Sequence, residues 1–544
     1  MPWWWLLAAL AFIAIRFLQP HYIDNETGYA LGPIRVLQPD VLSAHPLLER
    51  FNPFFWIFDL AASPFYLAFD WLWATLILRV LIWAFQLWAL ERLCRRLGLQ
   101  PWATLLALVL WLNVEQTLVA GEWIIGCASA KPVAYGFLFL ALEATLSGRP
   151  AAAGVFSGLA TCFHVLVGGW ATAALAGAVL VSTPRDRRIR TVLRFGLPAA
   201  AIGLVGLAPG LREVFAGSPA TSGEAAERAR LYVEWLNSYH VDPAYFMSPA
   251  EYVKIMAYGA VTLVAVFRLA RSGHRTLLVS FLGLLALIFA GGLLARGLEW
   301  WGVLKYYPFR VADGLYPLAF WVSVAGVVQL AVSRVGRPSW LLVAAALPFA
   351  SLVRHVNDRL GPTDSREERA SLLTSLLRSE PRMSAYWLRE TGREWLSHAR
   401  GEPLDDLDPM LTWIRAETPQ NAIFIIPPWR DDFTLRARRA EFISSKTPVT
   451  ERIAEYRDRL EALNGGPITS VGRAIFRDLR RNYPALTPEQ IRAATARFGG
   501  DYILTPTEYG GTLPLAHEAG PWRLYALRGV QRGARADPIM ARRR

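Results

Sequence analysis

The nine residues HYIDNETGY (21–29) directly follow the first apolar segment of the chain, and the rest of the sequence is interpreted from them. They place two carboxylates, two tyrosines and a histidine next to a segment long enough to enter a membrane. No other nine residues of the apolar half hold so many reactive groups. The stretch therefore predicts a polytopic membrane protein with its working site at the non-cytoplasmic surface.

Composition supports a membrane protein and argues against several other classes. The chain has 544 residues, is 53% hydrophobic and has 22 Trp, a residue that favours the membrane–water interface. A net charge of +13 is expected when Arg collects in cytoplasmic turns, so it does not by itself indicate nucleic acid. The cysteines Cys94, Cys127 and Cys162 show neither metal-ligand spacing nor an even count. The composition thus predicts neither a disulfide framework nor a zinc site.

Apolar runs long enough to cross about 30 Å of hydrocarbon recur up to residue 354. About eleven transmembrane helices are expected. The stretch 151–182 is expected to fold as two short helices or as one long kinked helix, with the break at Gly168-Gly169. The expected spans are 3–19, 71–90, 101–118, 132–147, 151–166, 168–182, 194–210, 251–269, 276–295, 312–332 and 338–354.

The distribution of Arg orients this bundle. With the N-terminus in the cytoplasm, the short basic turns, such as the run 185–190, all fall on the cytoplasmic side, as the positive-inside rule requires. The two long loops, 20–70 and 211–250, then face outward, where elaborated loops tend to carry function. An odd number of spans also sends the C-terminal part to the non-cytoplasmic side.

After residue 354 the composition changes from apolar to mixed. Residues 1–354 are expected to form the membrane domain, 355–404 a helical linker, and 405–544 a small soluble α/β domain in which helices alternate with short apolar strands. The expected helices are 410–417, 449–463 and one opened by the Thr-Pro-Glu sequence at 487–489; the expected strands are 421–428, 441–444, 502–505 and 522–527.

Motif absences exclude some chemistries. The chain contains no dinucleotide-binding glycine motif after a strand, no phosphate-binding Walker loop and no HExxH zinc motif. No cofactor is therefore expected, and no metal is indicated, although a divalent ion stays possible. Asp24 and Glu26, two residues apart, point in opposite directions on an extended loop, so one of them is expected to face a cavity as a general base. The alternative is a pair of solvated loop acids.

Several cations are expected near the same surface. Lys131 and Glu122 flank the turn before the fourth span, where a lysine commonly extends its ammonium toward the interface. His164 lies at the expected outer end of a helix, either as a functional group or as a hydrogen-bonded packing residue. Each of these residues has a structural as well as a functional interpretation.

The strongest cationic cluster is KYYPFR (305–310), which contains Lys305, Tyr307 and Arg310 and precedes the tenth span. A guanidinium beside an ammonium suits a lipid phosphate, because Arg offers a two-pronged donor. The alternative interpretation is a helix-end ion pair between Arg310 and Asp313. Positive charge on the outer side opposes the positive-inside bias, and this favours a functional role.

The layout resembles the GT-C class of membrane glycosyltransferases, and the closest likeness is to bacterial GT-C-like proteins. Four features carry the resemblance over nearly the whole chain. Members of this class usually carry two adjacent acids, whereas Asp24 and Glu26 are separated here by Asn25. The four features are the acids of DNE (24–26), the pattern KPVAY (131–135) with GRP (148–150), GLA (158–160) and His164, the YPFR sequence (307–310), and WIRAETPQNAIF (413–424).

The resemblance implies an inverting transfer from a polyprenyl-phosphate sugar in a bacterial inner (plasma) membrane to a glycan, lipid or protein acceptor, without nucleic acid. Asp24 or Glu26 takes the acceptor proton; Arg310 with Lys305, Lys131 and His164 binds the donor phosphate. Tyr29, Glu122 and Tyr307 line the acceptor side of the cavity. The competing hypotheses are a non-catalytic scaffold that binds lipid carriers and a secondary transporter, which would need midplane charges and inverted repeats.

Overall fold

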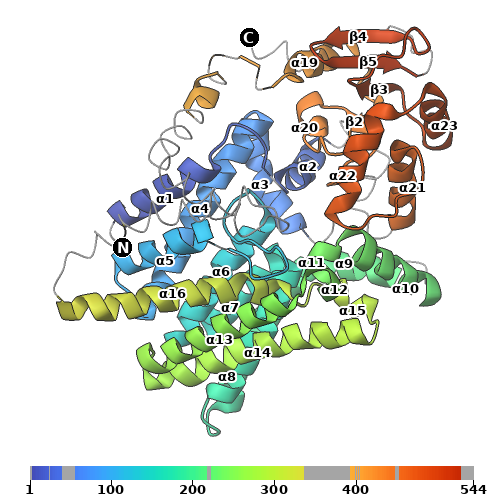
Figure 1. Cartoon of the computed structure of the whole chain (residues 1–544). Coiled ribbons are helices and arrows are strands. Elements are labelled where there is room, and N and C mark those ends of the chain that lie inside the picture. The colour runs from blue at the N-terminus through green and yellow to red at the C-terminus, as the bar shows by residue number, and fades with distance from the viewer. Residues whose placement is uncertain are drawn as a thin grey trace, which may run out of the picture.

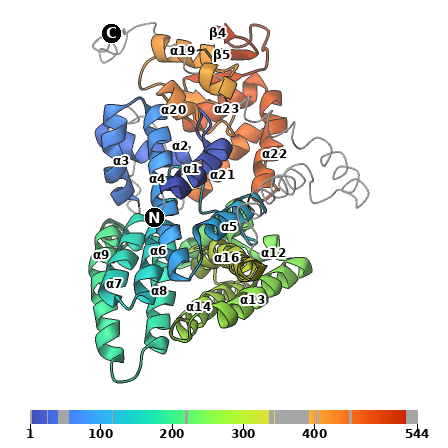
Figure 2. The ribbon, with the colours of Figure 1, turned by 90° about the vertical axis from the view of Figure 1, so that its left-hand side faces the viewer.

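The protein was analysed as a computed structural model, which describes residues 3–23, 25–38, 55–114, 116–216, 222–335, 343, 392–397, 400, 402–403, 405–446 and 452–527. It consists of a large helical part and a small mixed domain that lies against one end of it (Figures 1 and 2). Asp24, the expected span 338–354 except residue 343, and most of the expected linker 355–404 lie outside the described residues.

The helical part follows the apolar runs of the sequence closely. Its elements are α1 (Trp3–Phe17), α2 (Glu26–Leu37), α3 (Trp56–Ala68), α4 (Trp71–Arg96), α5 (Pro101–Val114), α6 (Ala130–Leu146), α7 (Pro150–Phe163), α8 (Val165–Ser182), α9 (Arg188–Ala216), α10 (Ser222–Arg230), the π-helix η1 (Leu231–Leu236), α11 (Ser238–Val241), α12 (Pro243–Phe246), α13 (Pro249–Leu269), α14 (Ser272–Gly297), α15 (Trp301–Leu304) and α16 (Arg310–Val335).

Within the described residues, six helices are long and apolar enough to cross a membrane: α4, α8, most of α9, α13, α14 and α16. The helices α1, α5 and α7 are apolar but shorter. The protein is therefore a mostly helical, multi-pass membrane protein, and the expected count of about eleven spans stays a prediction. The two long segments expected as outward loops contain the helices α2 and α3 in the first and α10 to α12 in the second.

The helix break near His164 differs from the expected one. His164 itself ends α7 and caps α8, whereas Gly168 and Gly169 lie inside α8. A Cβ added to Gly168 would lie 2.1 Å from the backbone nitrogen of Thr161, so this glycine allows α8 to fold back closely on α7. The break predicted at Gly168-Gly169 was thus wrong, because the glycine serves close helix approach rather than a turn.

Small residues also join α7 to α9. Gly154 and Gly158, one turn apart on α7, face α9, and a Cβ added to Gly154 would lie 2.1 Å from the carbonyl oxygen of Phe195. Close backbone approach through small residues is the usual way in which apolar helices pack in lipid. The pair therefore fixes the spacing of these two helices.

The C-terminal domain contains α19 (Asp408–Glu417), α20 (Phe433–Ala437), α21 (Ile453–Asn464), α22 (Arg473–Asn482), the 3-10 helix η2 (Tyr483–Ala485), α23 (Pro488–Phe498) and a five-stranded sheet. The strands, β1 (Ile423–Ile425), β2 (Ala440–Glu441), β3 (Tyr502–Thr505), β4 (Leu515–Ala519) and β5 (Trp522–Ala526), lie in the order β2-β1-β3-β5-β4. β1 pairs in parallel with β2 and β3, and β5 pairs antiparallel with β3 and β4.

Helices cover both faces of this sheet. Phe424 of β1 and Leu504 of β3 pack with α19 and α20, whereas Ile425 and Ile503, next to them in sequence, pack with α21 to α23. Alternate residues of a strand point to opposite faces, so apolar residues in succession require cover on both sides. The expected α/β organisation of this region is confirmed, and the Thr487–Gln490 capping box opens α23 where a helix start was expected.

Candidate functional site

The carboxylate of Glu122 is the centre of the largest cluster of predicted site residues. The Arg310 Nε and the Lys131 Nζ both lie 3.2 Å from Glu122 Oε2, and the Tyr135 hydroxyl donates to Oε1 at 3.3 Å. The Glu122 side chain is only 3% exposed, and the Lys131 side chain 8%. Two cations, from the first turns of α6 and α16, therefore share one buried carboxylate.

Aromatic rings hold these cations in place. The Arg310 guanidinium lies 3.8 Å from the centroid of the Tyr307 ring, and the Lys131 ammonium lies 4.8 Å from the Trp123 ring. The Tyr307 hydroxyl in turn hydrogen-bonds with that of Tyr232 at 2.8 Å. A cation on an aromatic face keeps donors available for an anion while its own position is fixed.

Asp313 shapes the loop that carries Glu122. Its carboxylate is fully buried and accepts hydrogen bonds from the Thr117 hydroxyl and from the backbone N–H groups of Val119, Ala120 and Glu122. The expected alternative, an Arg310–Asp313 ion pair, is not what the structure has: Arg310 pairs with Glu122 instead. Asp313 and Arg310 lie within one turn of α16, so this turn positions both the loop that carries Glu122 and the cation that pairs with it.

We expect Asp313→Asn to destabilise the protein by about 2–4 kcal/mol, because the amide can accept only part of four hydrogen bonds made to a buried charge. Thermal unfolding in lipid nanodiscs and hydrogen exchange of residues 117–122 measure this. Asp186→Asn serves as control, since Asp186 is 70% exposed between α8 and α9. Equal unfolding temperatures for both variants would show that the loop does not depend on this carboxylate.

The other predicted residues fall into two groups. Tyr29 and His164 lie close enough to Arg310 to feel its charge, and the two aromatic side chains both contact Phe55, at ring distances of 4.9 and 5.3 Å. His164 Nδ1 accepts from the Val167 N–H, so its Nε2 carries the proton and is a donor. Lys305 instead lies 5.1 Å from the exposed ring of Tyr306 and contacts neither Arg310 nor Glu122 in the described part of the chain.

Glu26 is occupied by a structural partner. Its carboxylate forms a two-pronged pair with Arg79 of α4, with Nε–Oε1 at 2.8 Å, and accepts from the N–H groups of Ala128 and Ile23. Both side chains of the pair are fully buried. In this geometry Glu26 holds α2 against α4. The predicted role of Asp24 or Glu26 as a base stays a prediction, and Asp24 lies outside the described residues.

The C-terminal domain covers this region from two sides. On one side, the Lys446 ammonium donates to Asn25 Oδ1 at 2.7 Å, and Arg438 pairs with Asp70 at 3.3 Å. On the other side, the Gly472 N–H donates to the Trp235 carbonyl at 2.6 Å, and Arg473 lies 4.8 Å from the Tyr239 ring. The C-terminal domain therefore contacts the segment between α1 and α4 on one side, and η1 and α11 on the other.

Asp431 lies at the same contact. The Ser445 hydroxyl donates to its carboxylate at 3.3 Å, and burial raises the pKa of Asp431 to about 6 against the opposing charge of Lys446.

Within the described residues no group of three or more His, Cys, Asp or Glu side chains is arranged to hold a metal ion.

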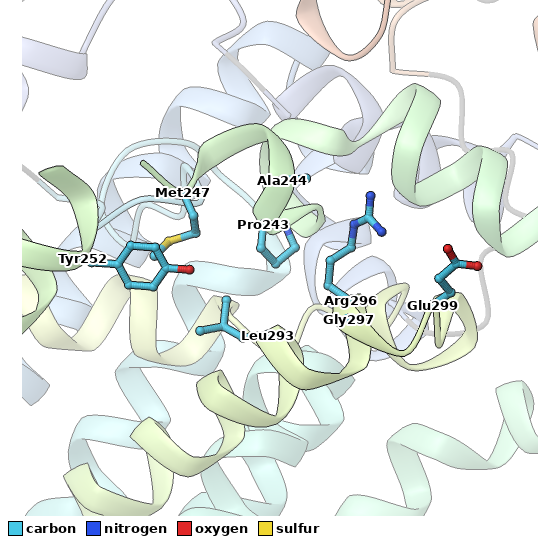
Figure 3. Close-up of a pocket in the computed structure, with 8 residues that line it drawn as sticks. All are labelled: Pro243, Ala244, Met247, Tyr252, Leu293, Arg296, Gly297 and Glu299. Atoms are coloured by element: carbon cyan, nitrogen blue, oxygen red, sulfur yellow. The ribbon is translucent and has the colours of Figure 1, made fainter. Parts of the chain in front are cut away.

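A separate pocket opens between α12, α13 and α14 (Figure 3). The Arg296 side chain at its wall is already engaged by Asp242, at 2.7 Å, and by Glu234. The pocket therefore offers no free cation and shares no lining residue with the Glu122 cluster. It is lined by Pro243, Ala244, Met247, Tyr252, Leu293, Arg296, Gly297 and Glu299.

Several residues of the site were not anticipated from the sequence. Arg79 could have been found, since a charged residue inside an apolar span needs a partner in the interior. Asp313 was considered only as a partner of Arg310. Tyr135 was noted only as part of the KPVAY pattern, and Tyr232 gave no sequence signal, because tyrosine is common near membrane interfaces for reasons unrelated to a site.

Comparison with known proteins gives limited matches. A family model described as a domain of unknown function (DUF6798) matches residues 405–463, the region of α19 to α21. No curated protein matches. The solved structure of the arabinofuranosyltransferase AftD from mycobacteria is similar over 92% of this chain and 36% of that chain, with 13% sequence identity and a TM-score of 0.43. This chain thus spans about a third of the length of that protein.

Proposed function

We propose that this protein is a membrane glycosyltransferase, which moves a sugar from a polyprenyl-phosphate-linked donor to an acceptor on the non-cytoplasmic face of a bacterial plasma membrane. The observation that carries the proposal is the sharing of Glu122 by Arg310 and Lys131. The other buried carboxylate nearby, that of Asp313, is taken up by one hydroxyl and three backbone N–H groups. The remaining N–H donors of Arg310 and Lys131 can therefore give charge-assisted hydrogen bonds to the singly charged phosphate of a glycosyl phosphodiester lipid.

The position of the cluster fits a donor that arrives through the lipid. Arg310 begins the candidate span α16, and Lys131 stands in the first turn of α6, so both cations are at the ends of apolar helices. His164 Nε2 carries the ring hydrogen, so it can donate a third hydrogen bond to the phosphate. The lipid tail then lies along the apolar helices, and the sugar lies under the C-terminal domain.

In the proposed step, the acceptor hydroxyl oxygen attacks the anomeric carbon of the donor sugar and forms the new glycosidic bond. The bond from that carbon to the phosphate oxygen breaks, and its electron pair remains on the lipid phosphate. Arg310 and Lys131 stabilise this added charge. The proton of the acceptor hydroxyl passes to the carboxylate of Asp24, which stands next to the Asn25 that Lys446 contacts.

The test is turnover of a panel of polyprenyl-phosphate sugars by the full chain in lipid nanodiscs. We expect the wild type to release lipid phosphate, and Asp24→Asn to bind the donor but to lower turnover by about 100-fold or more, since a general base contributes about 10²–10⁴-fold. Asp186→Asn, far from the cluster in sequence and exposed, is the control. If Asp24→Asn keeps wild-type turnover, Asp24 is not the base.

One observation favours a second candidate function, a protein that binds lipid carriers without transferring sugar. Glu26, Glu122 and Asp313 are each engaged by ion pairs or hydrogen bonds in the described part of the site. These three carboxylates are therefore not free to act as a base. Donor binding without turnover in every variant of the panel would support this candidate; absence of both binding and turnover would contradict both functions.

A further inference from the structure

His240 of α11 is held in one tautomer. Its Nδ1 lies 2.5 Å from the carbonyl oxygen of Ala120. A carbonyl oxygen can only accept, so Nδ1 carries the hydrogen, and a neutral imidazole then has its lone pair on Nε2. No hydrogen bond to Nε2 comes from the described residues. His240 therefore presents an acceptor nitrogen, the reverse of His164, whose Nε2 is a donor.

Two independent contacts fix the position of this ring. Gly121 has a positive φ of 69°, and a Cβ there would lie 3.1 Å from the ring of His240, so the loop carrying Glu122 lies directly on the imidazole. Two residues further on, Asp242 is tied to Arg296 of α14 at 2.7 Å. The short helix α11 is thus held between the Glu122 loop and α14, and the ring has little freedom to turn away.

Cations surround this imidazole. Arg310, Lys131 and Arg473 all act on it electrostatically, and the rings of Tyr239 and Tyr307 lie 4.2 and 6.4 Å from it. Tyr307 is the ring on which the Arg310 guanidinium rests. Burial and these three charges lower the pKa of His240 to about 3, against the opposing effect of the Ala120 carbonyl. At neutral pH the free site thus contains a neutral imidazole among cations.

We propose that His240 is a further ligand of the phosphate bound at this site, and that its imidazole takes up one proton when the phosphate enters. The inference rests on the proposed function, because it needs an anion at Arg310 and Lys131. Burial and the three cations keep the ring neutral in the free site, and the negative charge of the phosphate offsets the cations. Protonated Nε2 then donates a charge-assisted hydrogen bond to a phosphate oxygen.

Linkage fixes the direction of the effect. An anion that raises the proton affinity of His240 must bind more tightly as the pH falls, over the range between the free and bound pKa values of the ring. The free ring has a pKa of about 3. Affinity therefore increases, by up to about tenfold per unit of pH, as the pH falls below the pKa of the ring in the complex, and it is constant well above that pKa. Proton uptake per bound anion rises from zero toward one over the same fall in pH.

The experiment is calorimetric titration of the full chain in nanodiscs with a short-chain polyprenyl glycosyl phosphodiester, from pH 5 to 8. A phosphodiester has no ionisation in this range, so its own protonation does not contribute. Titrations in buffers of different ionisation enthalpy give the number of protons taken up. We expect proton uptake by the wild type to rise toward one per bound anion as the pH falls to 5, and none for His240→Gln, whose affinity then loses its pH dependence. A soluble methyl glycosyl phosphodiester, which also has no ionisation in this range, separates binding of a free phosphodiester from binding of the lipid in a parallel titration.

The control variant is His517→Gln, because His517 stacks on Trp413 in the C-terminal domain, at 4.5 Å, and takes no part in the site. It should take up the same proton as the wild type. Anion binding without proton uptake, or with uptake that persists in His240→Gln, overturns the role of His240 and leaves the proposed function standing. Absence of anion binding at every pH instead contradicts the proposed function itself.

Discussion

Replacing Arg79 by methionine is expected to destabilise the protein by about 3–5 kcal/mol, because the Glu26 carboxylate is then left buried without its counter-ion. Both side chains are fully buried. The guanidinium also donates to the backbone carbonyls of Phe17, Gln19 and His21, so its loss leaves three further buried or half-buried acceptors without a donor. Thermal unfolding in nanodiscs, monitored by the fraction of protein that remains folded after heating, measures this change.

A double variant tests the cause. Arg79→Met combined with Glu26→Leu removes both charges together, and replacing a buried pair by apolar residues is commonly close to neutral. We therefore expect the double variant to recover much of the lost unfolding temperature. If it is as unstable as Arg79→Met alone, the carbonyl contacts of Arg79 matter more than the charge of Glu26. If Arg79→Met melts like the wild type, the pair does not hold α2 against α4.

The second large effect is expected for Arg310→Ala, which should weaken binding of a polyprenyl phosphate by about 30-fold or more, or about 2 kcal/mol or more. The guanidinium supplies a fork of donors, and its loss leaves only Lys131 to balance Glu122. Binding to protein in nanodiscs, measured at fixed ionic strength, gives the change. Salt must be held constant because it screens the same charges.

Two matched variants show whether the effect comes from charge or geometry. Arg310→Lys keeps the charge but loses the fork and the stacking on Tyr307, so an intermediate affinity is expected. Arg92→Ala removes another arginine that pairs with a carboxylate, Glu143 at 3.6 Å, and should bind as the wild type does. An unchanged affinity in Arg310→Ala would place the phosphate elsewhere and remove the main support for the proposed donor.

The elements that were predicted well are those with a local cause. Apolar length alone places helices such as α13 and α14, since about twenty apolar residues in succession need lipid or a large core around them. In the C-terminal domain, strand β3 lies at Tyr502–Thr505 as expected, and α19 begins at the Asp408-Pro409 pair. A strand that is buried on both faces consists of consecutive apolar residues, and such a run can be recognised in the sequence.

The elements that were missed depend on their neighbours. The strand β4 has the sequence LAHEA, whose residues favour helices, and it forms a strand because it pairs with β5. The helices α2 and α3 lie within the stretch 20–70, which was expected to be an outward loop. Their buried faces, which include Ala30 and Phe58, are covered by α4 and by Leu435 of the C-terminal domain. Such partners lie far away in the sequence.

The same division holds for the site. The cations of the proposed phosphate site were singled out in the sequence, because Arg310 and Lys131 stand near the ends of expected spans on the side that is predicted to face outward. Their common partner could not be identified. Glu122 lies 188 positions from Arg310, and the two meet only because Asp313 holds the Glu122 loop at the start of α16.

The sequence by itself determined that this is a helical, multi-pass membrane protein with a small α/β domain, since apolar length and residue alternation act within one segment at a time. Only the tertiary structure decided which charges meet. It engaged Glu26 with Arg79, gave Glu122 to two cations, and placed His240 among them. The physical reason is that a buried charge is tolerated only beside a partner, and the chain finds that partner by packing helices that are distant in sequence.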